Sequence, residues 1–342
     1  MQEGNFDIKT KYLDCKTELI WGKHRDSIPY FTIMIPTYKR RNLLEQAVNS
    51  AINQRNFDDY EIVICDNDSL HNNETERFIR ELNNNKVVYY KNEKNIGMAG
   101  NIWKIVLNAR GKWVVLLDDD DLLAPNYLAT VYNYINKNNI CGMIGTNNFT
   151  IKGEDIFHFP DLCNKSLIYK VSKTDFFLGN CLSSPGQAMP KRIYIELLNS
   201  QKDENLMGDQ IVQYIFLKKY GLHKIEEPLT AYRICNNISQ NDDALKSMFL
   251  GMAQFWRNIG KDSMYIYLIT KFFYNEYVYI YVRNGIYGWK SSLDALKVMN
   301  EILSVKEFKT SKLRIIICQM LINYGRIICK ILRKINGQYI EC

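Results

Sequence analysis

The chain has 342 residues, of which 46% are hydrophobic and 24% are charged, a balance that is typical of a folded globular protein. Its length allows one large domain or two ordinary ones, and a chain of this size buries a core without disulfide staples. Disordered chains, collagen-like repeats and small disulfide scaffolds are therefore excluded.

The nine cysteines are irregularly spaced and form no CxxC pair, so they indicate neither a disulfide framework nor a zinc site. The first residues lack the basic-then-apolar pattern of a secretion signal. No run of about 18 uncharged apolar residues is present to span a bilayer. We therefore expect a cytoplasmic protein that does not cross a membrane.

The net charge of +7 is concentrated near the C-terminus. Residues 245–342 contain 15 Lys or Arg and 6 Asp or Glu, whereas residues 1–244 contain 29 and 31. This asymmetry predicts two regions with different partners, one of them anionic. We expect a first domain over residues 1–243 and a basic, helical domain over residues 244–342.

The first third of the chain alternates strand and helix patterns. Amphipathic stretches at helical spacing separate short apolar runs that predict buried strands. The predicted strands are 31–36, 60–65, 86–91 and 113–117. Such alternation predicts an α/β fold, with a parallel sheet that helices cover on both faces.

Polar groups follow three of these strands, at residues 37–40, 66–69 and 118–121. Ligands of open α/β sheets bind outside the carboxyl ends of the strands. We therefore expect the three polar segments to converge on one crevice.

Four consecutive aspartates, residues 118–121, directly follow the most apolar strand. Their mutual repulsion favours a hard divalent cation, Mg²⁺ or Mn²⁺, which takes one or two carboxylates and completes its shell with water and substrate phosphates. A solvated acidic turn that caps the next helix is the alternative. No GxxxxGK[ST] motif occurs, and no GxGxxG motif follows the first of these strands, so phosphates would be held by the cation and other groups.

The segments FTIMIPTYKRRNLLEQAVNSAINQ, YEIVICDNDS, NIGMAGN and GKWVVLLDDDDLLAPNYL resemble, in order and spacing, the nucleotide-binding half of a family 2 glycosyltransferase. The resemblance covers about residues 30–130, with weaker matches to about 240. It implies the GT-A fold of bacterial inverting enzymes, a Rossmann-like mixed or parallel sheet flanked by helices, here followed by an all-α C-terminal region. Residues 1–243 would then be the catalytic domain.

The implied reaction moves a sugar from a nucleotide-sugar, with a UDP-sugar favoured, to a hydroxyl group with inversion and with Mn²⁺ or Mg²⁺. The acceptor would be a glycan, a lipid-linked oligosaccharide or a glycoprotein, as in polysaccharide biosynthesis. The resemblance implies nucleotide-binding roles for Pro36, Thr37, Tyr38, Arg40, Asp66, Asn67, Asn95, Gly97, Asp118 and Asp119. Asn67 stands where the family often has a second Asp.

Asp118 and Asp120 match the family's DxD motif, and the resemblance makes Asp120 the main metal ligand, with Asp118 beside it. The GDQ segment at residues 208–210 resembles the motif whose aspartate is the general base, which makes Asp209 the catalytic residue. Gly208 replaces the family's Glu, and a helix-capping role for Asp209 is the alternative.

The remaining matches concern the sugar and the acceptor. The resemblance implies contacts there for Ser184, Gly186, Gln187, Asp121, Tyr232 and Arg233. Arg233 could contact phosphate through its planar guanidinium. Cys235 replaces a family His, and we expect it to be a small buried residue.

The C-terminal segment at residues 311–334 contains six basic residues and no acidic ones. At 100° per residue, one face carries Lys312, Gln319, Asn323, Arg326, Lys330, Arg333 and Lys334. Such a helix either lies on an anionic membrane surface, which would make the protein peripheral on the inner face, or packs its apolar face in its own domain or a homo-oligomer. Nucleic acid is not an expected partner, because aromatic residues do not interleave with the basic face.

Two other functions share the crevice. A nucleotidyltransferase would need a basic phosphate loop after the first of the predicted strands, where Lys39, Arg40 and Arg41 stand. A non-catalytic subunit that binds sugar nucleotides is compatible with the replacements at Gly208 and Cys235.

Overall fold

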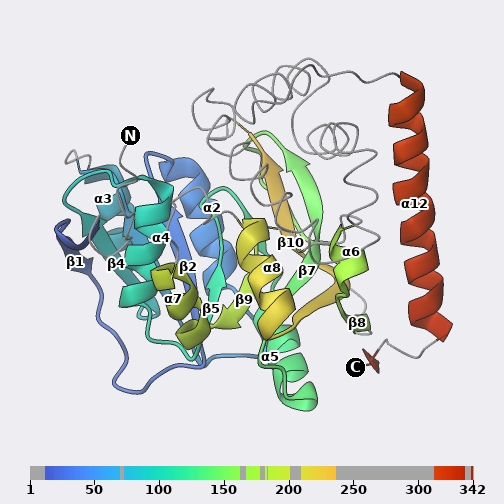
Figure 1. Ribbon diagram of the computed structural model, residues 1–342. Helices are drawn as coiled ribbons and strands as arrows, with labels where there is room; N and C mark the ends of the chain where they lie inside the picture. The colour runs from blue at the N-terminus through green and yellow to red at the C-terminus, as the bar shows by residue number, and fades with distance from the viewer. Residues whose placement is uncertain are drawn as a thin grey trace, which may run out of the picture. The chain divides into compact units, whose positions relative to one another are not determined.

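The computed structural model describes residues 12–69, 73–161, 167–177, 182, 184–200, 209–235, 312–335 and 340–341 (Figure 1). By its contacts the chain divides into two compact units. The first comprises residues 1–170, 182–235 and 340–342, and the second comprises residues 171–181 and 236–339. All the predicted site residues belong to the first unit. The predicted domain boundary after residue 243 lies outside the described residues and stays a prediction.

The sheet of the first unit is built around parallel strands. Neighbours in order are β4 (Val87–Asn92), β3 (Tyr60–Asp66), β2 (Phe31–Thr37) and β5 (Trp113–Leu116). All three pairings between them are parallel. This confirms the predicted α/β core, and it brings the carboxyl ends of β2, β3 and β5 to one edge.

Antiparallel and parallel pairings extend this core into a mixed sheet. β1 (Thr17–Trp21) pairs with β4, and β9 (Gln187–Pro190) joins β5 to β7 (Met143–Lys152). β10 (Leu222–Ile234) runs parallel to β7 and antiparallel to β6 (Leu122–Leu123) and β8 (Leu167–Lys170), and β11 (Ile340–Glu341) pairs with β8. β9 and β10 fall where the sequence pattern is irregular, and their pairing is decided by the neighbouring strands.

Helices flank the sheet as the alternation predicts. Those of the first unit are α2 (Arg41–Ile52), α3 (Asn73–Leu82), α4 (Gly97–Asn108), α5 (Tyr127–Asn138), α7 (Lys191–Ser200) and α8 (Asp209–Lys219). α8 begins at Asp209 and is followed by Gly221, whose φ of 99° suits a residue without a side chain.

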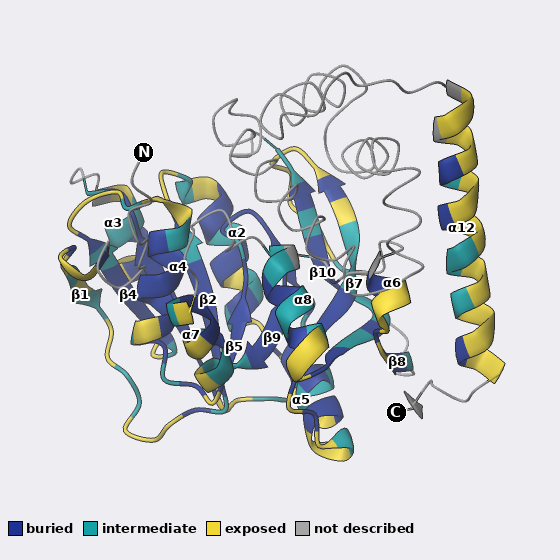
Figure 2. Cartoon of the chain, viewed as in Figure 1, coloured by how far each residue is buried: buried dark blue, intermediate teal, exposed yellow. Residues whose placement is uncertain are grey.

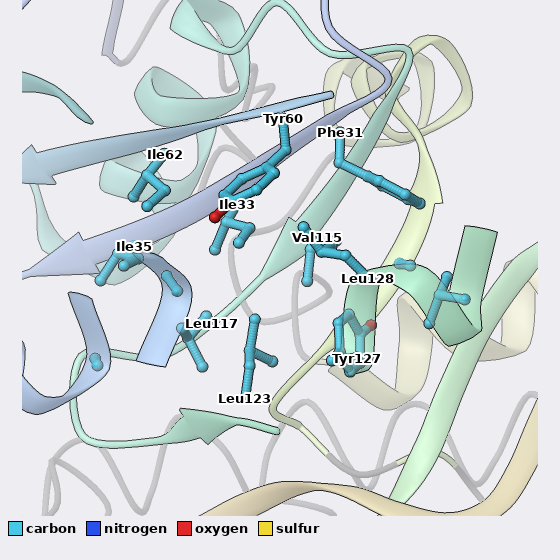
Figure 3. Packing of buried hydrophobic residues seen from close by; sticks show 14 of the residues in the cluster. Phe31, Ile33, Ile35, Tyr60, Ile62, Val115, Leu117, Leu123, Tyr127 and Leu128 are labelled. Carbon is cyan, nitrogen blue, oxygen red and sulfur yellow. The ribbon is translucent and has the colours of Figure 1, made fainter. Parts of the chain in front are cut away.

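The main core lies on the face of the sheet that α2, α3 and α5 cover. Ile33, Ile35 and Ile62 of the strands belong to one cluster with Leu117 and Leu128 (Figure 3). α4 contacts β2 and β3 through buried residues outside this cluster. The strands are thus covered on both sides, and their polar carboxyl ends lie together at one edge of the sheet.

The second unit contains the described helices α6 (Lys173–Phe177) and α12 (Lys312–Ile335), which contact each other. Arg333, which the sequence places on the basic face of α12, is buried in an ion pair with Asp175. Cys318 and Ile322 are also buried. The buried positions of α12 lie along one side of the helix (Figure 2). Much of its apolar surface is exposed instead, at Leu313, Ile316, Met320, Tyr324, Ile327 and Ile331.

Residues 236–311 lie outside the described part of the chain, so the all-α content predicted for the C-terminal region is seen in α12 alone. No helix within the described ranges is both long and apolar enough to cross a membrane.

Candidate active site

The loop that follows β2 is tied to the aspartate turn that follows β5. Thr37 Oγ1 donates to Asp119 Oδ2 at 2.7 Å. Arg40 Nη1 donates to Asp119 Oδ1 at 3.3 Å and to Asp120 Oδ2 at 2.8 Å. Burial raises the pKa of Asp119 to about 6, against the opposing effects of Thr37 and Arg40. The structure thus brings together Thr37, Arg40, Asp119 and Asp120, as predicted from the convergence of the strand ends.

The side chains of two other predicted residues of this loop, Pro36 and Tyr38, do not take part in these contacts. Pro36 is a half-buried residue of β2, and the Tyr38 side chain is exposed with the Lys39 ammonium 5.1 Å from its ring centre. The backbone N–H of Tyr38 donates to the Asp119 carboxylate. The exposed Tyr38 ring is therefore available to a ligand at this edge.

The polar segment after β3 is buried and held by its neighbours. Asp66 Oδ2 accepts from Tyr89 Oη at 2.9 Å, and Asp66 Oδ1 accepts from the backbone of Asp68 at 2.8 Å. Burial raises the pKa of Asp66. The Asn67 amide donates to the Gly97 carbonyl at 3.0 Å and accepts from Asn92 Nδ2 at 2.8 Å.

These contacts revise the role predicted for Asn67. Only 3% of the residue is exposed, and its amide joins β3 to the turn before α4. In that turn Asn95 Oδ1 accepts from the backbone of Gly97 at 2.9 Å, and Gly97 has a φ of 74°. We therefore interpret Asn67 as the residue that fixes this turn rather than as a reader of the nucleotide base.

Ser184 joins the aspartate turn to the start of α8. Its hydroxyl contacts Asp118 Oδ2 at 3.1 Å and is also hydrogen-bonded to the Asp209 carboxyl group. Burial raises the pKa of Asp118 to about 8, and the nearby Asp209 adds to the shift. Burial also raises the pKa of Asp209. The predicted base and the predicted DxD motif therefore lie on either side of one hydroxyl group.

A serine hydroxyl has one proton and can donate to only one carboxylate at a time. A second bond to Ser184 requires that the other carboxyl group donates. In this structure the hydroxyl donates to Asp118, and Ser184 opposes, in both Asp118 and Asp209, the rise in pKa that burial causes.

Gly186 and Gln187 are bound to the end of β5, next to the acidic turn. The backbone N–H of Gly186 donates to the Leu116 carbonyl at 2.8 Å, and Tyr127 Oη donates to the Gly186 carbonyl at 2.5 Å. Gln187 is a buried residue of β9 that pairs with Leu116. These positions make them structural neighbours of the acidic turn, and the predicted acceptor contact of Gln187 is not supported by its burial.

The prediction that Arg233 contacts phosphate is not supported either. The residue is only 1% exposed, and its Nε donates to the Asp120 carbonyl at 2.8 Å. Its terminal nitrogens donate to the carbonyls of Gly153 and Asp155 and to Gln46 Oε1. The guanidinium thus braces the acidic turn from within the protein.

The neighbours of Arg233 differ in exposure. Tyr232 is half-buried on β10. Cys235 is half-buried too, contrary to expectation, and its thiol donates to Asp120 Oδ2 at 3.6 Å. Burial, with help from Asp120, raises the pKa of the Cys235 thiol to about 11, so it is protonated at neutral pH.

Asp121 is fully buried, and its Oδ1 accepts from the backbone of Arg233 at 2.7 Å. Its Oδ2 has no hydrogen-bond partner within the described residues. Burial raises the pKa of Asp121 well above its ordinary value, and the nearby Asp118 and Asp120 act in the same direction. Asp118, Asp120 and Asp121 lie close enough to disfavour one another's ionised forms, and a nearby positive charge would offset this effect.

The donor set suits a hard divalent cation, since carboxylate oxygens are the ligands that Mg²⁺ and Mn²⁺ prefer. In the described part of the chain, no group of three or more His, Cys, Asp or Glu side chains is arranged to hold an ion by itself. A site of one or two carboxylates, completed by water and a diphosphate, agrees with both observations.

Comparison with known proteins shows which class of protein this chain resembles. Residues 32–192 match the family model described as Glycosyl transferase family 2. An uncharacterized glycosyltransferase, MJ1057, of Methanocaldococcus jannaschii is 25% identical over 74% of this chain and 89% of its own length. The GalNAc(5)-diNAcBac-PP-undecaprenol beta-1,3-glucosyltransferase of Campylobacter jejuni is 24% identical over 65% of this chain and 70% of its own.

Among solved structures, S. aureus TarS 1–349 in complex with UDP-GlcNAc covers 80% of this chain and 73% of its own, with a TM-score of 0.53 and 14% identity. This likeness shows a shared fold, the GT-A fold that the resemblance implied. Residues 32–192 therefore carry a glycosyltransferase family 2 domain, and the chain is a glycosyltransferase.

Proposed function

We propose that the enzyme transfers a sugar with inversion from a nucleotide-sugar, with a UDP-sugar favoured, to an acceptor hydroxyl group. The observation that carries this proposal is the Ser184 hydroxyl, which lies between Asp118 of the acidic turn and Asp209 at the start of α8. An inverting transfer needs a carboxylate opposite the leaving group, close to the donor site yet separate from it.

In the proposed reaction the acceptor oxygen attacks the anomeric carbon while its proton passes to the Asp209 carboxylate. The bond between the anomeric carbon and the diphosphate oxygen breaks, and its electron pair leaves with the nucleoside diphosphate. A divalent cation at Asp120 and Asp118, when bound, would stabilise the negative charge on that leaving group. Asp209 suits the role because its raised pKa makes it a stronger base than an exposed Asp.

The nucleotide would lie along the edge formed by the loops after β2 and β3. Tyr38 offers an exposed ring there, and the turn before α4 is held in place by Asn67. The nucleotidyltransferase alternative loses support, because Arg40 pairs with Asp119 and Asp120 and Arg41 pairs with Glu45.

The acceptor we propose is a glycan or a lipid-linked oligosaccharide of a cell-surface polymer. The C. jejuni relative, whose name specifies an undecaprenol-linked acceptor, supports this choice. We include a glycoprotein acceptor as an alternative, since the residues between β9 and α8 that would select the acceptor lie partly outside the described part.

The exposed apolar side of α12 supports an anionic membrane surface as the partner of the second unit. Arg314, Lys330 and Lys334 are also exposed on this helix, so cationic groups accompany the apolar residues. Exchange of Ile327 and Ile331 for Glu should abolish co-sedimentation with phosphatidylglycerol vesicles, and Leu107→Glu on α4 should not. If the protein instead forms a concentration-dependent dimer and does not co-sediment with vesicles, this surface would belong to a homo-oligomer.

The proposed donor and cation can be tested together. Release of nucleoside diphosphate is measured from UDP-, GDP- and dTDP-sugars, with Mn²⁺ or with EDTA, in the presence of mixed acceptors. We expect release from a UDP-sugar with Mn²⁺, and none with EDTA or in Asp120→Asn. Equal release with EDTA would contradict the role of the cation, and release from a GDP-sugar alone would contradict the choice of donor.

A further inference from the structure

Arg40 occupies the position in which a cation would meet the acidic turn. It precedes α2 as the N-cap residue, after Lys39, which has a φ of 56°. Its Nη1 reaches both Asp119 and Asp120, and the closer contact is to Asp120 Oδ2 at 2.8 Å. The side chain of Arg40 is 20% exposed and those of the two aspartates are 9% exposed, so this ion pair is largely shielded from water.

The oxygen that Arg40 contacts has a second protein donor. The Cys235 thiol donates to the same Asp120 Oδ2 at 3.6 Å. On Asp119, Oδ1 accepts from Arg40 and Oδ2 accepts from Thr37. Asp120 Oδ2 and both oxygens of Asp119 therefore receive hydrogen bonds from the protein before any ligand binds.

A guanidinium and a divalent cation cannot share one carboxylate oxygen at close range, because like charges repel strongly where water is scarce. A cation that takes Asp120 must therefore displace Arg40 from it. The displacement costs a charge-assisted hydrogen bond, which is stronger than a neutral one. A diphosphate offsets this cost in two ways, since it supplies oxygen ligands to the cation and is itself a good acceptor for a guanidinium.

We propose that Arg40 competes with the divalent cation for Asp120, so that the cation binds weakly to the free enzyme and tightly only together with the nucleoside diphosphate. The inference rests on the metal-assisted reaction proposed above. Arg40 is thereby a positioning residue that couples cation binding to donor binding.

The test measures binding of Mn²⁺ alone, from the electron paramagnetic resonance signal of the free ion, with and without UDP. Replacement of Arg40 by Met should tighten Mn²⁺ binding without UDP by roughly tenfold, the effect of losing one charge-assisted competitor. The enhancement by UDP should shrink in the same variant. Lys39→Met is the matched control, because it removes an adjacent positive charge that contacts the Tyr38 ring.

Unchanged or weaker Mn²⁺ binding in Arg40→Met would overturn the proposal. Equal tightening in Lys39→Met would do the same, since net charge and not contact would then be responsible. Arg40→Gln, which keeps a hydrogen-bond donor without the charge, provides the comparison if the Met variant does not fold.

Failure of the proposed function is separable from failure of this inference. Tighter Mn²⁺ binding in Arg40→Met without turnover of any UDP-sugar would support the competition and refute the donor. Metal-dependent turnover of a UDP-sugar, with Mn²⁺ binding unaffected by Arg40→Met, would refute the competition alone.

Discussion

The backbone N–H of Arg233 donates to Asp121 Oδ1 at 2.7 Å, and the Arg233 guanidinium donates to the carbonyl of Asp120. One residue at the end of β10 thus fixes both the main chain and a side chain of the acidic turn that follows β5. β6 and β10 pair next to it, at Leu122 and Ala231, which sets the register of this contact.

Arg233→Gln should lower the free energy of unfolding by about 3 kcal/mol, because it removes the guanidinium's bonds to the buried Asp120 carbonyl, to the carbonyls of Gly153 and Asp155 and to Gln46. Urea denaturation measures this. The matched change Arg192→Gln, on an exposed ion pair of α7, should alter it by no more than about 0.5 kcal/mol. Equal effects of the two changes would contradict the bracing role of Arg233.

Ser184→Ala should lower kcat about tenfold and change the KM for the donor little. The loss corresponds to one hydrogen bond to a charged group, here between the acidic turn and Asp209. Steady-state release of nucleotide measures both constants. Ser200→Ala, which removes a hydroxyl bonded to the Leu197 carbonyl in α7, should leave them unchanged. A rise in KM alone would show that Ser184 serves donor binding instead.

The activity should fall at low pH through a group whose pKa lies above that of an ordinary Asp. Burial raises the pKa of Asp209, and a base works only when it is deprotonated, so kcat is lost as pH decreases through that raised value. Ser184 opposes the shift, and its replacement by Ala should move the acid limb to higher pH. A pH profile of kcat at saturating donor and acceptor checks this, and a limb that stays in place would be inconsistent with the assignment.

Gly186→Ala should be more destabilising than Gly153→Ala, although both glycines have a φ of 71°. A Cβ at Gly186 would lie 2.5 Å from Thr230 Cγ2, whereas one at Gly153 would meet nothing within 4 Å. We expect losses of about 3 kcal/mol and about 1 kcal/mol, since only the first adds overpacking to backbone strain. The difference in stability loss between the two variants is measured from their denaturation midpoints at equal slopes. Equal losses would show that backbone strain alone is responsible.

Much of the first unit could be predicted from its sequence, because its strands are short apolar runs that end in polar residues. β2, β3 and β5 follow this rule, and parallel pairing then brings Thr37, Asp66 and Asp118 to one edge. β9 and β10 could not be predicted in this way. Their residues do not alternate regularly, and they pair with strands that are distant in the sequence.

The hydrogen-bond partners of Arg233 and Asn67 could not be predicted from a sequence motif. An Arg near a crevice can donate to phosphate or to backbone carbonyls, and Arg233 donates to Gln46, 187 residues away. Asn67 is likewise engaged by Asn92 on a neighbouring strand. Such contacts depend on distances that only the folded chain defines. Ser184 was placed near the acceptor by resemblance, but its link between Asp118 and Asp209 carried no sequence signal.

The most direct test of the account compares release of UDP by the wild-type enzyme, Asp209→Asn and Asp58→Asn, with the responsive UDP-sugar, Mn²⁺ and acceptor. Asp58 is exposed and pairs with Lys86, so its change controls for the loss of a carboxylate. We predict that Asp209→Asn binds UDP with unaltered affinity and lowers kcat by at least about a hundredfold, as expected for a general base. Wild-type kcat in Asp209→Asn would contradict the central claim.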